Sequence, residues 1–473
     1  MMKQWFIWRR LVALIGIGGL LLGLSSCKSD DDEVADLSEE GTNDWIYKVM
    51  SNYYLWYEDM PEKDRLNFSQ SPDKFFETLL SDEDGVQFGD DWLPFSTIEQ
   101  KEEATKSISA SDSYGFEFAT YKSGNNYYVW VLYVLPGSPA AEAGLKRGDW
   151  VIAVGSDTPN ISNLSALQQG AATTFQLAEA KVEGKKVTFY RTQSISVAAS
   201  RAVEDTPFLK DSVYTIGGKR IGYLMYNSFT SGPNDETEVY DEQMKQLFAH
   251  FKSEQVSEFV LDLRYNPGGL LTSAQLMTSF LAPAEALGKT FCYQEYNDKQ
   301  EKSNKETKFL KSTDLGNANL DLERIYVLIG STTASASEAV INCLIPYMGR
   351  SNITIIGEQS LGKRVGSNTF GTKDDYDWLL HPITFRIYNA DRTADYEGGF
   401  EPDVPVDELV IGNELLPFGD TQELLLSEAI SRITGANVRS IKTRTAVEDT
   451  PKAVPAFYNR KVGGLIDKSD NLE

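Results

Sequence analysis

Two polar segments, each directly after an apolar run, carry residues that could perform nucleophilic chemistry. Residues 325–330 are apolar, and Ser331 to Glu338 lead from them into an apolar stretch with helical spacing. A serine at the start of a helix lies at the positive end of the helix dipole, where backbone amides can stabilise a developing oxyanion. The spacing Ser335-x-x-Glu338 also fits a helix capping box, which needs no catalysis. The spacing alone favours the cap.

The second segment contains a lysine. An apolar run at residues 353–356 leads into a glycine-flanked loop that ends at Lys363. A lone lysine in a loop is ordinarily a solvated surface charge. To act as a general base it must be neutral, so burial has to lower its pKa from about 10.4 towards about 7 to 8. The glycines and the apolar strands nearby make such burial possible.

A third apolar run, residues 260–263, leads into the double glycine Gly268-Gly269. Glycines let the backbone approach a ligand closely and direct amides at it, as an oxyanion site requires. Taken alone, this step is equally an ordinary turn between a strand and a helix.

Histidine is rare, and its placement favours a lysine base. The chain has 2 histidines, His250 in a helical stretch and His381 in an expected strand, and neither lies in a recognisable triad motif. A serine–lysine pair is therefore a better hypothesis than Ser-His-Asp. There is no H-E-x-x-H motif or comparable cluster, so a metal site loses support. We expect no cofactor.

The elements that must position these residues follow from periodicity. Strands and helices alternate from Lys219 to Gly435, which predicts a mixed or largely parallel α/β sheet with helices near residues 236–251, 271–281 and 337–344. Aromatic residues between 45 and 57 recur at spacings of three and four, which predicts a helix in a small N-terminal helical domain. Short β runs at residues 114–121, 127–135 and 150–154 predict a β-rich module between the two.

The N-terminal residues indicate export. Lys3, Arg9 and Arg10 precede an apolar run that is too short to span a membrane, and Leu24-Ser25-Ser26-Cys27 resembles a bacterial lipobox. We therefore expect a lipid anchor on Cys27, with an ordinary signal peptide or an uncleaved anchor as the alternative. The acidic residues 28–33 resemble the tether of Bacteroidetes lipoproteins of the outer membrane, although a solvated linker explains them equally. Location in the cell envelope, periplasmic or surface-exposed, follows.

Charge and cysteine content exclude other classes. The 473 residues have a formal net charge of −24, which makes nucleic acid an improbable partner. Besides Cys27 there are only Cys292 and Cys343, too few for a disulfide framework or a thiolate metal site. The sequence does not decide whether these two pair, nor does it give the oligomeric state.

Residues 135–149, Leu-Pro-Gly-Ser-Pro-Ala-Ala-Glu-Ala-Gly-Leu-Lys-Arg-Gly-Asp, strongly resemble the PDZ domains of bacterial proteases. Pro139 suits the first turn of a helix and Gly144 its C-terminal cap. The resemblance implies that the loop Tyr114-Gly115-Phe116-Glu117-Phe118 receives the carboxylate of a peptide that adds itself as a strand. The alternative is a PDZ fold that only packs and gates.

Taken together, Ser335-Ala336-Ser337-Glu338, the Gly362-Lys363 step, the Asp262-Leu263-Arg264 strand with its glycines and the PDZ run resemble the carboxyl-terminal processing peptidases, also called tail-specific proteases. The resemblance covers roughly residues 107–435. It implies that Ser335 is the nucleophile, that Lys363 is the base, and that the amides of Ala336 and of Gly268 or Gly269 form the oxyanion site. It also implies a crotonase-like (ClpP/crotonase-type) mixed sheet, with the PDZ domain inserted upstream.

Two features depart from the family pattern. Many members have a glutamine four residues after the lysine, whereas this chain has Ser367, which could orient the amine instead. The separation between Ser335 and Lys363 is about three residues longer than usual, an insertion that a loop can absorb.

The expected organisation is a signal peptide (1–26), a tether (27–42), the N-terminal helical domain (43–106), a PDZ domain (107–195), the catalytic domain (196–435) and a tail (436–473). The expected function is a serine endopeptidase that cleaves extended or unfolded polypeptides. Two alternatives stay open: an envelope lipoprotein that binds peptides or proteins with a silent site, and a binder of apolar small ligands.

Overall fold

The computed structural model describes residues 37–88, 91–101, 112–160, 164–233, 237–372, 376–435, 451–455 and 465–467. The expected signal peptide, Cys27 and residues 28–33 of the tether lie outside these ranges, as does most of the tail. In the described part, no helix is both long enough and apolar enough to cross a membrane.

The largest sheet holds the three apolar runs that precede the candidate residues. Its strand order is β11 (Phe208–Ile216), β12 (Lys219–Tyr226), β13 (Glu258–Asp262), β16 (Ile325–Ile329), β17 (Ile353–Gly357) and β21 (Val404–Pro405). All neighbours from β12 to β21 are parallel, and only β11 runs antiparallel at the edge. Because the carboxyl ends of parallel strands meet at one edge of a sheet, the loops after β13, β16 and β17 converge.

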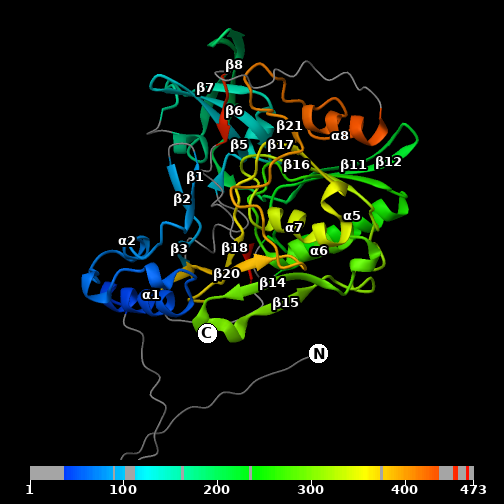
Figure 1. Cartoon of the computed structure of the whole chain (residues 1–473). Coiled ribbons are helices and arrows are strands. Elements are labelled where there is room, and N and C mark those ends of the chain that lie inside the picture. Colours follow the sequence, from blue (N-terminus) through cyan, green and yellow to red (C-terminus); the bar gives the residue numbers. More distant parts are fainter. Residues whose placement is uncertain are drawn as a thin grey trace, which may run out of the picture.

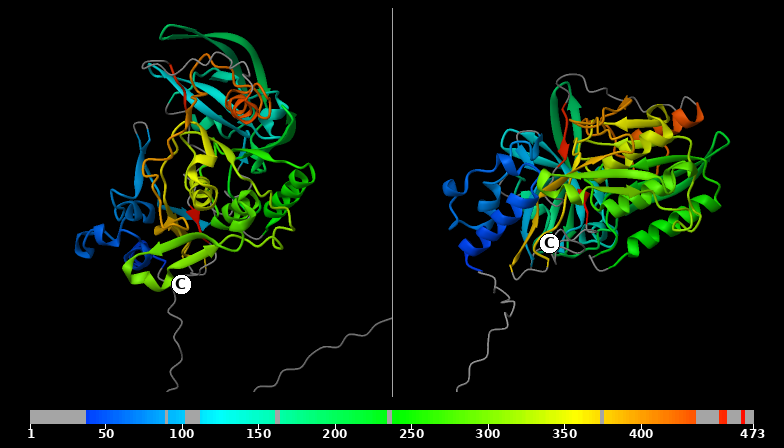
Figure 2. Two further views of the ribbon diagram at one scale, coloured as in Figure 1. Left: turned by 45° about the vertical axis from the view of Figure 1, so that its right-hand side comes forward. Right: turned by 60° about the horizontal axis from the view of Figure 1, so that its bottom comes forward.

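Helices cover both faces of this sheet (Figure 1). One face packs against three helices in a core that includes Met244, Met277 and Val340. These helices are α5 (Val239–Ser253), α6 (Leu271–Leu281) and α7 (Ala336–Met348). The other face packs against α8 (Leu424–Thr434), which shares a core with the PDZ strands through residues such as Ile430 and Trp130. The left view of Figure 2 shows α8 (orange) against these strands (cyan).

A second sheet lies below the helices in Figure 1 and continues from the lysine loop. Its order is β15 (Lys305–Lys308), β14 (Thr290–Tyr296), β20 (Ile383–Tyr388), β18 (Val365–Ser367) and β23 (Leu465–Ile466). Since β18 begins two residues after Lys363, this sheet fixes the far end of the lysine loop. The mixed α/β class expected from the sequence is confirmed.

The PDZ module is a six-stranded sheet with a short helix, α4 (Pro139–Glu142), that begins at Pro139 after the Ser138 cap. The strand order is β22 (Val454–Pro455), β5 (Phe116–Ser123), β6 (Asn126–Val134), β7 (Trp150–Val154), β8 (Thr173–Glu183) and β9 (Lys186–Val197). A separate pair, β4 (Asp112–Ser113) and β10 (Arg201–Ala202), joins the two ends of the module. The strand β22 comes from the C-terminal tail, so the sheet is completed by residues more than 300 positions away.

The N-terminal domain contains strands as well as the expected helices. The helices are α1 (Glu39–Tyr53) and α2 (Pro72–Glu77), and the strands are β1 (Gly85–Phe88), β2 (Asp91–Pro94) and β3 (Thr97–Gln100). The aromatic helix ends at Tyr53, since the backbone of Tyr54 is extended, and the buried Tyr54 hydroxyl donates to Asp84 at 2.8 Å. Strand β3 pairs with β19 (Trp378–His381), a long-range partner that local periodicity could not reveal.

This domain packs directly against the lysine segment. One core cluster combines Ile46, Phe75 and Phe95 with Leu361 and Val365, which flank Lys363. The N-terminal domain therefore forms one wall around the candidate base.

Short 3₁₀ turns occur at Tyr57–Asp59, Lys63–Arg65, Leu164–Leu167, Ala284–Ala286, Asp298–Ser303 and Arg350–Asn352.

Cys292 and Cys343 are free thiols, both fully buried. They belong to the core between the second sheet and α7, where burial raises the pKa of Cys343. They therefore pack as apolar residues.

Candidate active site

Ser335 lies at the junction between β16 and α7 in a strained backbone conformation. Its φ is 59° and its ψ is −112°, an arrangement that a residue with a side chain rarely adopts. The side chain is 1% exposed, and Oγ has no hydrogen-bond partner within the described residues. Ser335 is the N-cap of α7 and forms a capping box with Glu338, as their spacing predicted. The strained backbone of the buried serine at a strand-to-helix turn is in addition a feature of functional sites.

Glu338 joins the serine segment to the lysine segment. Its Oε2 accepts hydrogen bonds from the backbone N–H of Ser335 at 2.8 Å and of Lys363 at 2.9 Å. Its Oε1 accepts from Ser360 Oγ at 2.6 Å and from the N–H of Gly362 at 2.7 Å. Burial raises the pKa of Glu338 to about 7, while the four donors favour its charged form. The carboxylate that sequence spacing assigned to a cap thus holds both segments together.

Lys363 is completely buried, and its amine faces the N-terminal domain. Desolvation lowers the pKa of Lys363 to about 8, against the opposing charges of Asp84 and Glu338. The amine donates to the carbonyl oxygen of Phe95 at 3.4 Å and lies 4.9 Å from the centre of the Phe95 ring. In this structure no hydrogen bond joins it to Ser335, whose Oγ has no partner.

The double glycine lies against Ser335. A Cβ added to Gly268 would come 2.8 Å from Ser335 Cβ and 3.1 Å from the amide nitrogen of Ala336, so only glycine fits there. The N–H of Gly268 donates to Asn266 Oδ1 at 2.9 Å. The carbonyl of Gly269 accepts from the N–H of Ile466 in the tail at 3.1 Å. The structure therefore brings Ser335, Ala336 and Gly268 together, with the Gly268 amide already engaged, while Gly269 packs against the backbone of Phe229.

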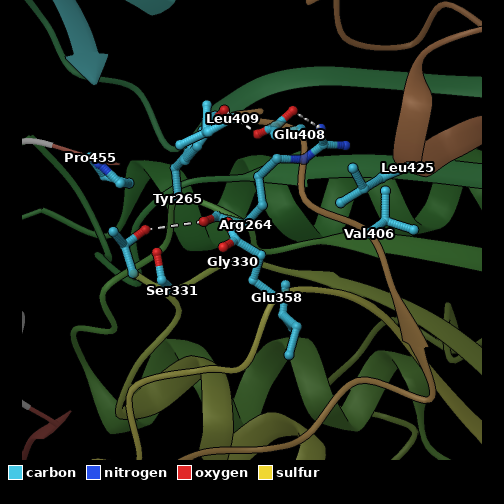
Figure 3. A pocket seen from close by; sticks show the side chains of 12 residues that line it. Arg264, Tyr265, Gly330, Ser331, Glu358, Val406, Glu408, Leu409, Leu425 and Pro455 are labelled. Carbon is cyan, nitrogen blue, oxygen red and sulfur yellow. Dashed lines mark hydrogen bonds and ion pairs between the residues drawn. The ribbon is translucent and has the colours of Figure 1, made fainter. Parts of the chain in front are cut away.

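A buried charge network fixes the strand that leads to these glycines. The guanidinium of Arg264, 1% exposed, donates to Asp262 at 2.9 and 2.7 Å, to Glu408 at 2.7 Å and to Glu423 at 2.7 and 3.0 Å. Figure 3 shows Arg264, Glu408 and Tyr265 gathered around a cavity of about 10 Å³. That volume is close to the smallest that can hold one water molecule. The network leaves Arg264 little freedom, so the loop after β13 is held in place.

The PDZ module contributes its own arginine to this network. Arg147 donates to Glu408 at 2.7 Å, to Tyr265 Oη at 3.1 Å, and to the carbonyls of Leu132 and Leu416. Its side chain is 6% exposed. Arg147 belongs to the Lys-Arg-Gly-Asp end of the PDZ run, so the module is anchored next to the loop that follows β13.

Ser367, expected to orient the lysine amine, lies on β18 and is 2% exposed. Its carbonyl accepts from the N–H of Asp467 at 3.1 Å, and no described hydrogen bond links it to Lys363. The structure places Phe95 at the amine instead. Residues next to the lysine, including Gly362, Arg364 and Phe95, line an open pocket of about 160 Å³ between the two domains.

The expected peptide loop of the PDZ module precedes β5. Tyr114, Phe116 and Phe118 are each 2% exposed and belong to the PDZ core, and the Tyr114 hydroxyl donates to the carbonyl of Ala171 at 2.6 Å. Gly115, with φ 80°, packs against Ser138, and its N–H donates to Ser113 Oγ at 2.8 Å. Glu117 is half-buried. At the outer edge of β5, Ala119 and Thr120 pair with the two residues of β22.

Comparison with known proteins decides the family. Models of the S41 peptidase family, its N-terminal domain and a PDZ domain match residues 220–406, 41–97 and 130–173, respectively. The crystal structure of a protein assigned to the S41 proteases, from Bacteroides fragilis, is 34% identical with a TM-score of 0.70. The match covers 83% of this chain and 97% of the chain in the Bacteroides fragilis structure. This chain belongs to peptidase family S41. The resemblance drawn from the sequence motifs is confirmed.

Curated relatives of this S41 chain carry names that specify processing. The carboxyl-terminal-processing protease of Picosynechococcus is 26% identical over 64% of this chain and 66% of its own length. The carboxy-terminal processing protease CtpA of Bacillus subtilis is 26% identical over 60% and 54%. The chain thus aligns with between about half and two thirds of the length of these relatives.

The possible metal ligands and the two histidines can also be located in this S41 chain. No group of three or more His, Cys, Asp or Glu residues there could hold a metal ion. His381 contacts Glu99 and Thr369, each at 3.1 Å, and His250 is exposed on α5.

Sequence reasoning missed two parts of the site. These are the joining role of Glu338 and the contribution of Asp84 and Phe95. For Glu338 the signal existed, since an acid three residues after a serine was noted only as a cap. Asp84 and Phe95 lie in a different domain about 270 residues before the lysine, and no local pattern connects them.

Proposed function

We propose that this chain is a serine endopeptidase of the serine–lysine type, acting on extended or unfolded polypeptides. The observation that carries the proposal is the pair of buried groups on segments that share one carboxylate. Ser335 presents an unpaired hydroxyl at a strained turn, and Lys363 has a desolvated amine whose pKa is about 8. An amine with that pKa is partly neutral near pH 7 to 8 and can act as a general base.

In the proposed mechanism, the neutral amine of Lys363 turns from Phe95 to Ser335 and accepts the hydroxyl proton. The serine oxygen attacks the peptide carbonyl, and the oxyanion receives hydrogen bonds from the amides of Ala336 and Gly269, since Gly268 already donates to Asn266. The lysine ammonium then protonates the leaving amine, and water releases the acyl enzyme. Ser367 is proposed only as a more distant aid to the lysine.

The remaining expectations enter as parts of this proposal. A crotonase-like description of the catalytic domain, the domain boundaries given above and a lipid on Cys27 that retains the protein in the cell envelope all rest on sequence resemblance. The loop at residues 114–118 and the β5 edge are proposed to bind the C-terminal end of a peptide. The names of the relatives support the same substrate class.

The experiment is cleavage of an unfolded protein such as denatured casein by the protein without residues 1–26. Wild type should release peptides, while Ser335→Ala and Lys363→Ala should each be inactive with an unchanged circular dichroism spectrum. Undiminished turnover in either variant would remove the serine–lysine assignment.

A second candidate, a binding protein with a silent site, is favoured by one observation: the amine of Lys363 contacts Phe95 and not Ser335. Peptide binding without any release of fragments by wild type would support that candidate.

A further inference from the structure

A single peptide group connects the candidate base to a buried acid of the N-terminal domain. The carbonyl of Phe95 accepts from the Lys363 amine at 3.4 Å. The N–H of the same peptide group, that of Ser96, donates to Asp84 Oδ1 at 3.0 Å. We call this unit the Phe95–Ser96 peptide group. A carboxylate and an amine thus contact opposite ends of one amide dipole.

Asp84 is buried, and each of its carboxyl oxygens accepts a hydrogen bond. Its side chain is 0% exposed, and its second oxygen accepts from the Tyr54 hydroxyl at 2.8 Å. The Tyr54 oxygen in turn accepts from the N–H of Ser81 at 3.0 Å. Burial raises the pKa of Asp84. The hydrogen bonds from Ser96 and Tyr54 oppose this shift, because they favour the carboxylate.

The electrostatic consequence follows from the alignment. A negative charge at the N–H end of an amide increases the negative character of its oxygen, because hydrogen bonds in a chain polarise one another at low dielectric. The charged groups that act on the Lys363 amine are Asp84 from the N-terminal domain and Glu338 from α7. Glu338 is already engaged by four donors, whereas Asp84 acts along the hydrogen bond that holds the amine.

We propose that Asp84 is a positioning residue for Lys363. Acting through the Phe95–Ser96 peptide group, it holds the amine and sets the pH at which the amine loses its proton. The N-terminal domain is then a component of the catalytic apparatus. This inference rests on the proposed function only in calling Lys363 the base, since the effect on the amine exists with or without turnover.

The test is the titration of Lys363 by NMR of ¹³Cε-labelled lysine, assigned with Lys363→Arg. Asp84→Asn is close in size and can keep both contacts if the Tyr54 hydroxyl turns to accept. Removing the opposing charge should lower the titration midpoint by about one pH unit, the lower end of the usual effect of a neighbouring opposite charge. Asp82→Asn, an exposed acid two residues away, is the matched control and should leave the midpoint unchanged.

Turnover gives an independent arm. In Asp84→Asn the rising limb of kcat/KM against pH should move to lower pH by the same amount, which a purely structural role would not produce. An unshifted midpoint for Lys363 in folded Asp84→Asn overturns the inference. If the wild type has no turnover while the Lys363 midpoint still shifts in Asp84→Asn, the result counts against the proposed function and not against this inference.

A measurement on the wild type covers the case in which Asp84→Asn does not fold. The amide proton of Ser96 should change its chemical shift with the same midpoint as Lys363, because both belong to one hydrogen-bonded chain. A Ser96 amide that is insensitive to pH across that midpoint contradicts the proposal.

A separate observation concerns the tail. Val454 and Pro455 pair with the outer edge of β5, opposite Thr120 and Ala119 in antiparallel register, while residues 451–453 pair with residues 409–411. The other edge of β5 is taken by β6. Val454 and Pro455 therefore occupy part of the edge where an added peptide strand would bind.

This segment is attached through its backbone and one charged side chain. The N–H of Ala453 donates to the carbonyl of Leu409 at 3.0 Å, and Ala453 is 0% exposed. The Lys452 amine contacts Asp407 at 2.8 Å and also Glu358. Only two residues pair with β5 itself, and the other contacts of the segment are its backbone pairing with residues 409–411 and two ion pairs.

We infer that residues 451–455 are an internal ligand of the PDZ sheet edge, which a peptide substrate must displace. The inference rests on the peptide-binding part of the proposed function. Lys452→Glu places a third carboxylate beside Asp407 and Glu358 and should release the segment by repulsion. Lys452→Arg, which keeps the charge, is the matched control.

The assay is fluorescence anisotropy of a fluorescein-labelled decapeptide with a free, apolar C-terminal residue, in the Ser335→Ala background. Lys452→Glu should bind it at least about five-fold more tightly than Lys452→Arg, since a competitor has been removed. Ala453→Pro, which cannot donate to Leu409, should act in the same direction. Equal affinity in both variants and the control overturns the inference, and failure of every variant to bind counts against the peptide-binding role itself.

Discussion

Glu338→Gln should separate Ser335 from Lys363 while barely changing the size of the buried side chain. The carboxylate accepts four hydrogen bonds, two on each oxygen, at 2.6 to 2.9 Å. A glutamine has one acceptor oxygen and one NH₂ group. With the NH₂ group at the Oε2 position, the N–H groups of Ser335 and Lys363 both face hydrogens. At the Oε1 position only the N–H of Gly362 does, because the Ser360 hydroxyl can turn and accept.

The magnitude follows from the lost bonds. A hydrogen bond to a charged group contributes about 1.5–3 kcal/mol, so losing one or two should lower the free energy of unfolding by about 1.5–6 kcal/mol. If the NH₂ group replaces Oε2, the backbone of Ser335 and of Lys363 must move. If it replaces Oε1, the backbone of Gly362, next to the lysine, must move. A displacement of about 1 Å at reacting groups costs about 100-fold in rate, which is the loss expected in acylation.

Urea unfolding gives the stability change, and labelling by a fluorophosphonate probe gives the acylation rate. Glu397→Gln is the control, since Glu397 is exposed and pairs with Arg364 next to the same loop. That change should cost less than about 1 kcal/mol. If Glu338→Gln were as stable and as rapidly labelled as Glu397→Gln, the role of Glu338 in joining the two segments would be refuted.

Further expectations follow from the buried charges. The acylation rate should rise with pH around a midpoint of about 8, because only the neutral Lys363 amine accepts a proton. Arg147→Met should lower the free energy of unfolding by about 3–5 kcal/mol in urea, since it leaves Glu408 short of a partner in a buried network. Burial alone would raise the pKa of Glu408, but Arg264 and Arg147 hold it at about 2. The stability that it contributes should therefore be present above about pH 4.5 and lost as the pH falls towards 2. In Glu408→Gln, the free energy of unfolding measured in urea should lack this loss between about pH 4.5 and 2. His381→Gln should leave turnover unchanged in the casein assay, because His381 contacts Glu99 and Thr369 and not Ser335.

The elements next to the site could be predicted because their signals are local. Residues 271–281 and the apolar run at 325–329 coincide with α6 and β16. Burial on both faces of a parallel sheet imposes continuous apolar runs, and such runs are visible in the sequence. The same runs place the serine, lysine and glycine loops at one edge, so their proximity could be reasoned without coordinates.

What could not be predicted depends on contacts between distant residues. The partner of the Lys363 amine is Phe95, 268 positions earlier, whereas sequence reasoning considered Ser367. The strands β22 and β23 have two residues each, too few for any periodicity, and exist only because longer strands offer them an edge. Side-chain rotation at Lys363 is likewise set by packing against the N-terminal domain and not by its own sequence neighbours.

The central claim is that a neutral amine at Lys363 activates the hydroxyl of Ser335. The most direct measurement is the site and rate of fluorophosphonate labelling, followed by mass spectrometry, in wild type and in Lys363→Met over a range of pH. We expect a single adduct on Ser335, formed at a rate that rises around pH 8 in wild type and falls by about 10²–10⁴-fold, without pH dependence, in the variant. Equal labelling rates in the two proteins, or an adduct on another residue, would contradict the account.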